Sequence, residues 1–130
     1  MIEVGALVLY ARDMQKTAEF YRTLGIPLEK EDHGEGPVHF ATELGPVHYA
    51  IYPSLAPGSG PARHSAGDTF HGLYVDSLDA VKDRLKAIGA SMLSDHEIMP
   101  WGCRLVARDP DGRAVEVNQR GHCPASNEGA

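Results

Sequence analysis

The sequence predicts an α+β fold made of two tandem βαβββ modules. Two amphipathic helical patterns occur in the 130-residue chain, and each is preceded by one strand pattern and followed by several more. Shifting the chain on itself by 64 positions superposes the caps and the apolar stripes of the two helices, which indicates an internal duplication. The composition, 42% hydrophobic and 23% charged residues, is that of a globular protein. An ordinary α+β sandwich with an accidental repeat is the alternative.

The first module begins with an alternating apolar stretch, Ala6–Tyr10, which predicts a strand. A helix is expected between Asp13 and Gly25. Aspartate is a favoured N-cap, apolar residues recur at three- and four-residue steps, and glycine suits the left-handed residue that ends many helices. The strands expected after it flank the turn Gly45-Pro46 and cover Val38–Leu44 and Val47–Tyr52.

The second module repeats this order. Phe70–Val75 predicts its first strand, and a helix is expected between the N-cap Ser77 and Gly89. The strands expected at its end flank the turn Asp109-Pro110-Asp111-Gly112 and cover Cys103–Ala107 and Ala114–Asn118.

The modules form one predicted domain over residues 1–121. Module one spans 1–52, and module two spans 68–120. Between them lies a linker, 53–67, in which 12 of 15 residues are Pro, Gly, Ser or Ala and which therefore cannot bury a core. Residues 121–130 are small and polar, so a mobile tail is expected there.

Charge and hydropathy exclude several classes of partner. The net charge is −6, and no cluster of Lys and Arg exists that could neutralise phosphates, so no nucleic-acid partner is expected. No run approaches the ~20 apolar residues of a membrane span, and the start lacks the basic and apolar regions of a signal peptide. Two cysteines, Cys103 and Cys123, make no disulfide framework and fit a reducing compartment. A cytoplasmic protein is expected.

Several motifs together resemble the vicinal oxygen chelate superfamily, the group of glyoxalase I, bleomycin-resistance proteins and extradiol dioxygenases. The most specific combination is the Asp109–Gly112 turn followed by Glu116, near Trp101-Gly102. The likeness covers nearly the whole chain and is closest in pattern to a small bleomycin-resistance-like member. It implies that each module curls a mixed sheet into a half-barrel, with helices outside and a ligand in the concave interior.

The resemblance also implies four positions for the ligands of a divalent metal. They fall on Ala6, Ala50, Phe70 and Glu116, and three of these side chains have no donor atom. Strand alternation places His48 on the same face as Ala50, so a two-residue shift would add His48 as a ligand. No metal and no cofactor are therefore expected, with a divalent metal on Glu116 and His48 as the alternative.

Four other histidines show no recognised ligand spacing and are expected on the surface. They are His33, His64, His96 and His122.

The cavity is expected to be rich in aromatic side chains with a few polar groups, as a flat or amphipathic ligand requires. Trp101 follows a proline in a loop and is expected at the rim. For Phe70, Tyr74 and Tyr10, packing inside the half-barrel is the favoured interpretation, because small half-barrels must fill their interiors, and contact with a ligand is the alternative. The predicted ligand-binding residues are Tyr10, His48, Tyr52, Phe70, Tyr74, Trp101, Arg104 and Glu116, with Asn118 as a further candidate.

Glu116 is the most informative of these residues. A carboxylate facing an apolar barrel costs free energy unless it is paired or neutral. Its candidate partners are Arg104 on the neighbouring strand, His48, or a cationic ligand. A Glu116–Arg104 pair that merely satisfies both groups is one interpretation; in the others, Glu116 anchors a ligand or, in an enzyme, acts as the catalytic general base.

Three functional hypotheses follow. The leading one is a metal-free protein of the bleomycin-resistance type that sequesters an aromatic or cationic small molecule, as a homodimer. The second is a metal-dependent lyase or isomerase of the glyoxalase type, with a degenerate site on Glu116 and His48. The third is a regulatory or structural module whose cavity is filled by its own side chains.

Overall fold

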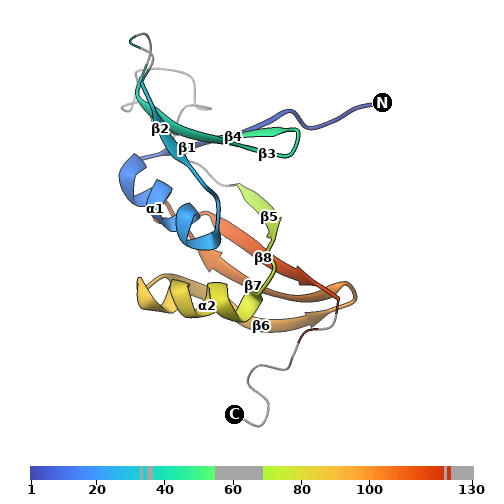
Figure 1. The fold of residues 1–130 in the computed structure, drawn as a ribbon. Helices are drawn as coiled ribbons and strands as arrows, with labels where there is room; N and C mark the ends of the chain where they lie inside the picture. Colours follow the sequence, from blue (N-terminus) through green and yellow to red (C-terminus); the bar gives the residue numbers. More distant parts are fainter. Residues whose placement is uncertain (33, 35–36, 55–68, 122, 124–130) are drawn as a thin grey trace. The chain divides into compact units, whose positions relative to one another are not determined.

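The computed structural model describes residues 1–32, 34, 37–54, 69–121 and 123. It contains two compact units, one of Met1–Arg22 with Ile26–Gly67 and one of Thr23–Gly25 with Asp68–Ala130. Each unit has the order strand, helix and three strands, so the predicted α+β fold of two βαβββ modules is confirmed (Figure 1). Almost all of the predicted linker and tail lies outside the described residues.

The first unit has a four-stranded mixed sheet in the order β1-β4-β3-β2. Strand β1 pairs parallel to β4, and the other pairs are antiparallel. The observed elements are β1 (Ala6–Ala11), α1 (Met14–Leu24), β2 (Glu29–Glu31), β3 (His39–Leu44) and β4 (Val47–Pro53).

Helix α1 begins and ends where the sequence predicts. The Asp13 carboxylate accepts a hydrogen bond from the backbone N–H of Lys16 (3.1 Å), and Gly25 has the positive φ of a left-handed residue, 112°. The ring of Tyr21 meets that of Tyr49 on β4, with centroids 5.9 Å apart. The helix therefore covers the Tyr49 face of the first sheet, as strand alternation predicts.

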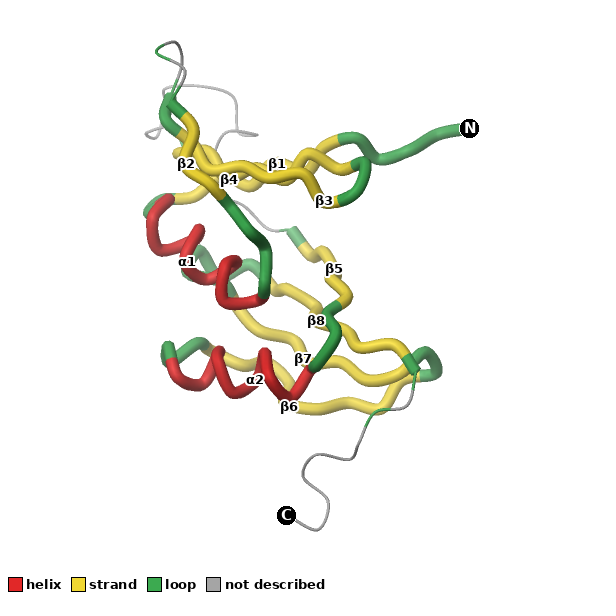
Figure 2. The backbone as a smooth tube through the Cα atoms, viewed as in Figure 1, coloured by secondary structure: helices red, strands yellow, loops and turns green. Residues whose placement is uncertain are grey.

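The second unit has the equivalent sheet, in the order β5-β8-β7-β6. Helix α2 contacts β7 and β8 and runs along one face of this sheet (Figures 1 and 2). The observed elements are β5 (Phe70–Tyr74), α2 (Leu78–Ala87), β6 (Ser91–Met99), β7 (Gly102–Arg108) and β8 (Ala114–Arg120).

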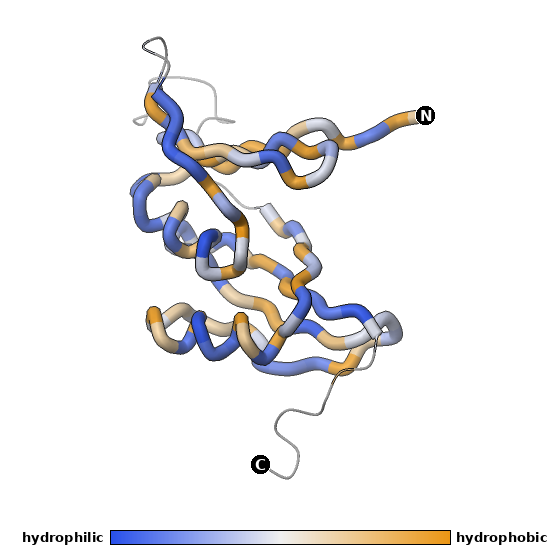
Figure 3. The backbone as a smooth tube through the Cα atoms, in the orientation of Figure 1, coloured by the Kyte–Doolittle hydropathy of each residue, from blue (hydrophilic) through white to orange (hydrophobic). Residues whose placement is uncertain are grey.

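Helix α2 buries an apolar stripe and has two N-terminal caps. Leu78 and Leu85 are buried, and the chain along α2 alternates between hydrophobic and hydrophilic residues (Figure 3). Ser77 caps locally, accepting a hydrogen bond from the backbone N–H of Ala80 (3.2 Å). The backbone N–H of Leu78 donates to the side-chain oxygen of Gln119 on β8 (2.7 Å), so a distant strand completes the cap.

A buried ion pair holds the turn between β7 and β8. The Asp109 carboxylate accepts from the Arg113 guanidinium (2.6 Å) and from the backbone N–H groups of Asp111 (2.8 Å) and Arg113 (3.0 Å). Both side chains of the pair are at most 1% exposed. Because Asp109 satisfies backbone and side-chain donors together, it determines the path of the chain between the two strands.

The cysteines differ from the expectation of free thiols. Cys103 on β7 and Cys123 are joined by a disulfide, with their Cα atoms 5.9 Å apart. Cys123 lies in the segment predicted as a mobile tail, and the bond connects this residue to the sheet. Spacing along the chain carried no sign of this pair, because it depends on where the chain goes after β8.

None of the helices in the described ranges is both long and apolar enough to cross a bilayer.

Candidate functional site

The face of the second sheet turned away from α2, here called the open face, carries most of the predicted site residues. Val115 and Val117 on β8 are fully buried, so Glu116 and Asn118 point to the opposite side. The neighbouring strands follow in register, with Gly72 of β5 opposite Glu116. The open face comprises Phe70, Gly72, Tyr74, Ser94, Glu97, Trp101, Arg104, Val106, Glu116 and Asn118.

At the centre of the open face, one guanidinium bridges two carboxylates. Arg104 donates to Glu116 at 2.5 Å and to Glu97 at 2.9 Å. Hydrogen bonds from Arg104 and then Ser94 hold the pKa of Glu97 below its ordinary value. The pKa of Arg104 is raised, first by its hydrogen bond to Glu97 and then by its hydrogen bond to Glu116. One guanidinium and two carboxylates have a formal charge of −1.

The second oxygen of Glu116 continues the network to the tryptophan. It accepts from the Asn118 amide (2.9 Å), whose own oxygen accepts from the Trp101 indole N–H (3.0 Å). A Cβ added at Gly72 would stand 2.9 Å from the same Glu116 oxygen. The Glu116 carboxylate is thus held on both sides, and the absence of a side chain at residue 72 leaves room for it.

Three aromatic side chains of the open face are solvent-exposed. The exposed fractions are 62% for Phe70, 49% for Tyr74 and 40% for Trp101. The prediction that Phe70 and Tyr74 pack inside a core is therefore wrong. The Arg120 guanidinium lies 3.6 Å from the centroid of the Tyr74 ring, a cation–π contact that covers part of that ring.

The remaining predicted residues lie together in the first unit. Strand register pairs Ala6 with His48 and Tyr10 with Tyr52, so these side chains share one face. Tyr52 stacks on His39 with centroids 4.2 Å apart, and the His48 imidazole bonds the carboxylate of Glu43. His48 and Glu116 therefore each have a partner within their own unit.

The residues at the positions implied for a metal do not fit a divalent ion. Ala6, Ala50 and Phe70 have no donor atom, and the Glu116 carboxylate already accepts hydrogen bonds from Arg104 and Asn118. A catalytic zinc site usually has three protein ligands, and one engaged carboxylate does not replace them.

Two polar members of the open face were missed from the sequence, Ser94 and Glu97 on β6. The pairing of β6 with β7 shifts register between Met92 and Ser94, and again between Ser94 and Glu97. Simple alternation fails across such irregularities, so no sequence signal assigned these side chains to a face.

His96 lies on β6 and is partly buried, contrary to the surface position expected for it. The three histidines grouped with it in that expectation, His33, His64 and His122, lie outside the described residues.

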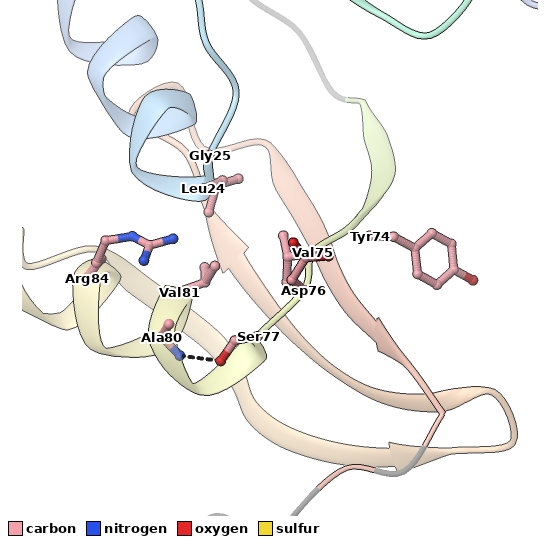
Figure 4. Close-up of a pocket in the computed structure, with 9 residues that line it drawn as sticks. All are labelled: Leu24, Gly25, Tyr74, Val75, Asp76, Ser77, Ala80, Val81 and Arg84. Atoms are coloured by element: carbon pink, nitrogen blue, oxygen red, sulfur yellow. Dashed lines mark hydrogen bonds between the residues drawn. The ribbon is translucent and has the colours of Figure 1, made fainter.

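A separate pocket of about 360 Å³ lies at the N-terminal half of α2 (Figure 4). Of the predicted site residues only Tyr74 lines it, and the Tyr74 ring points away from the other lining side chains. Arg84 crosses it and donates to the backbone oxygen of Thr23 (3.0 Å). The pocket is lined by Leu24, Gly25, Tyr74, Val75, Asp76, Ser77, Ala80, Val81 and Arg84.

Solved structures with this fold include one described as an antibiotic binding protein and one described as a lyase. TioX from Micromonospora sp. ML1 is 18% identical, with a TM-score of 0.69 over 92% of this chain and 99% of that one. TnmS3, an antibiotic binding protein from Streptomyces sp. CB03234, is 22% identical, with a TM-score of 0.66 over 93% and 98%. Lactoylglutathione lyase from Agrobacterium tumefaciens is 26% identical, with a TM-score of 0.61 over 90% and 92%.

No curated protein matches the chain. A family model, however, matches residues 3–117, which run from before β1 to the middle of β8. The match extends over both units and includes the Asp109–Gly112 turn and Glu116. The chain belongs to the Glyoxalase/Bleomycin resistance protein/Dioxygenase superfamily.

Proposed function

We propose that this protein binds an aromatic, cationic small molecule without a metal, and that the open face supplies the binding surface. The observation that carries the proposal is the exposure of Phe70, Tyr74 and Trp101 around the Glu97–Arg104–Glu116 ion pairs. Exposed aromatic side chains next to a few fixed polar groups are typical of a ligand site.

The charges on this face favour a cation. At the centre of the face two carboxylates share one guanidinium, which leaves a formal charge of −1 there, and the exposed rings of Phe70 and Trp101 attract cations over their faces. The Tyr74 ring already carries the Arg120 guanidinium. The indole N–H of Trp101 already donates to Asn118, so the ring offers its apolar surface for stacking. A flat cation could therefore stack on the rings while its charge faces Glu97 or Glu116.

The family and its fold neighbours are consistent with this function. A structure of the same fold is described as an antibiotic binding protein. A homodimer in the cytoplasm remains part of the proposal, and light scattering on the purified protein measures the oligomeric state.

The second candidate is a metal-dependent lyase or isomerase with Glu116 and His48 as ligands. The lactoylglutathione lyase of the same fold, at 26% identity, favours it. In this chain both ligands would have to leave their present partners, Arg104 and Glu43. Metal-dependent turnover of lactoylglutathione that is lost in both Glu116→Gln and His48→Gln would establish this candidate in place of the first.

The direct test is a melting-shift screen that pairs aromatic cations with neutral analogues of the same ring systems. A ligand at 100 times its Kd stabilises the folded state by about 2.7 kcal/mol, which is visible as several degrees. Because Trp101 is the sole tryptophan, its fluorescence reports directly on stacking. Binding of cations with quenched emission is expected. Equal binding of the neutral analogues, or no binding within a broad panel, would contradict the proposal.

A further inference from the structure

The strongest donor cluster in the described part of the chain lies away from the open face. His96, Cys103 and Cys123 bring one nitrogen and two sulfur atoms within 4.8 Å of one another. In the described residues, these three form the group in which at least three possible metal ligands lie close enough to hold one ion. We propose that in the reduced protein these three residues bind zinc or a similar soft divalent ion.

The donor chemistry selects the ion. Two thiolates and one imidazole are typical ligands of zinc, with Zn–S bonds of about 2.3 Å and Zn–N bonds of about 2.0 Å. Tetrahedral geometry then requires the donor atoms to be about 3.3–3.8 Å apart. The three donor atoms already lie within 4.8 Å of one another, and once the disulfide is reduced the two sulfurs have to separate to this spacing. Three protein ligands leave the fourth position to water.

The backbone already holds two of the ligands in place. Cys103 is fully buried on β7, and His96 lies on β6, which pairs with β7. Cys123 follows β8 closely, where the Gly121 backbone N–H donates to the Trp101 oxygen (2.9 Å). This bond keeps the end of β8 beside the β6–β7 turn, so Cys123 stays near Cys103 after the disulfide is broken.

The zinc site is distinct from Glu116. Successive side chains of a strand point to opposite faces, so Cys103 points away from the face that carries Arg104 and Glu116. Zinc binding at the cysteines therefore needs neither Glu116 nor His48.

Oxidation state decides whether the site exists. A thiol reductant such as glutathione supplies two electrons and two protons, so the Cys103–Cys123 bond becomes two S–H groups while two reductant thiols become one disulfide. Zinc then displaces the two thiol protons and binds both sulfurs. With the disulfide formed, neither sulfur is a thiolate, and the site is closed.

The test uses the full chain and Co²⁺, whose spectrum reports tetrahedral thiolate ligation. Protein reduced with a phosphine and desalted without oxygen is titrated with Co²⁺, and zinc is then added. The expected result is one equivalent of Co²⁺ with thiolate charge-transfer and intense d–d bands, which zinc abolishes. The disulfide form is expected to give no bands. Bands of equal strength in both forms, or none in the reduced form, would overturn the proposal.

Four variants assign the ligands. Cys123→Ser should remove the charge-transfer bands. It should not affect folding, because residue 123 lies outside the strands. His96→Gln should weaken zinc binding at least about tenfold, since even the loss of an outer hydrogen-bond partner costs that much. The matched controls, His48→Gln and Glu116→Gln, should leave the titration unchanged. Loss of binding in a control, with full binding in Cys123→Ser, would place the ion elsewhere and refute the assignment.

Discussion

The two units share one order of elements and differ in the connection before their last strand. In the first unit, the turn Gly45-Pro46 joins β3 to β4 without any charged group. In the second, the buried Asp109–Arg113 pair holds the longer turn between β7 and β8. A buried charge is tolerated only with its partner, so the second turn depends on single side chains in a way that the first does not.

The strand centres differ in the same way as the turns, apolar in the first unit and charged in the second. At equivalent positions of the last strands, 66 residues apart, the first unit has the fully buried Ala50 and the second has Glu116, whose side chain is 19% exposed. Opposite them lie Val8 and Gly72. One backbone plan thus supports an apolar strand centre in one unit and a charged network in the other. Within this fold, function depends on the side chains of one face rather than on the topology.

The largest expected effect concerns the turns. Asp109→Ala leaves the buried Arg113 guanidinium without its carboxylate and should lower the free energy of unfolding by about 3–5 kcal/mol. Pro46→Ala in the first unit should cost about 0.4–1 kcal/mol, through greater freedom of the unfolded chain. Urea denaturation measures both. The double variant Asp109→Ala/Arg113→Met should recover part of the loss, and equal losses in the two turns would remove the proposed contrast.

The next effect concerns ligand binding. Glu116→Gln removes one of two carboxylates beside the proposed ligand and should weaken binding of an aromatic cation about ten- to a hundredfold, the value of a charge-assisted contact. The melting temperature should stay within a few degrees. Its counterpart Glu43→Gln removes the carboxylate bound to His48 in the first unit and should not affect binding. A large loss of melting temperature in Glu116→Gln with intact binding would show a purely structural ion pair.

A smaller effect distinguishes the two strand centres. Gly72→Ala would place a Cβ 2.9 Å from the Glu116 oxygen, so the carboxylate must move. The expected loss of stability is about 1–2 kcal/mol, the usual cost of overpacking, together with weaker ligand binding. Val8→Ala, at the equivalent position of β1, should not change ligand binding, because Val8 lies opposite the uncharged Ala50. Unaltered ligand affinity in Gly72→Ala would argue against the fixed carboxylate as part of the site.

The smallest effect is a pH dependence carried by one unit. Burial lowers the pKa of His71 below 6.5, Asp109 opposes this shift, and Arg113 adds to it. Below pH 6.5 the unfolded chain therefore binds a proton that the folded chain does not, and stability falls as the pH falls. Leu7 occupies the equivalent position of β1. His71→Leu should remove this dependence of the free energy of unfolding on pH, which amounts to at most about 1.4 kcal/mol per pH unit. Urea denaturation between pH 7 and about 5.5 measures it.

Local signals in the sequence determined the elements of the fold. The N-caps Asp13 and Ser77, the helical stripes and the glycines beyond them act within a few residues, so the helices begin and end where predicted. The family resemblance placed Glu116 in the concave interior, and in the structure its neighbours Val115 and Val117 are buried on the opposite face. Arg104 was one of three candidate partners for Glu116, and the structure shows the ion pair with it.

Tertiary structure alone decided the features that join distant residues. The irregular pairing of β6 with β7 brought Glu97 to Arg104, and the path after β8 brought Cys123 to Cys103. Gln119 caps a helix that begins 41 residues before it. Each depends on strand register or on a chain path that no local pattern encodes, because a shift of one residue along a strand reverses the face of every side chain. The sequence thus determined the elements and the direction of the Glu116 side chain, and the register between strands decided its network and the cysteine–histidine cluster.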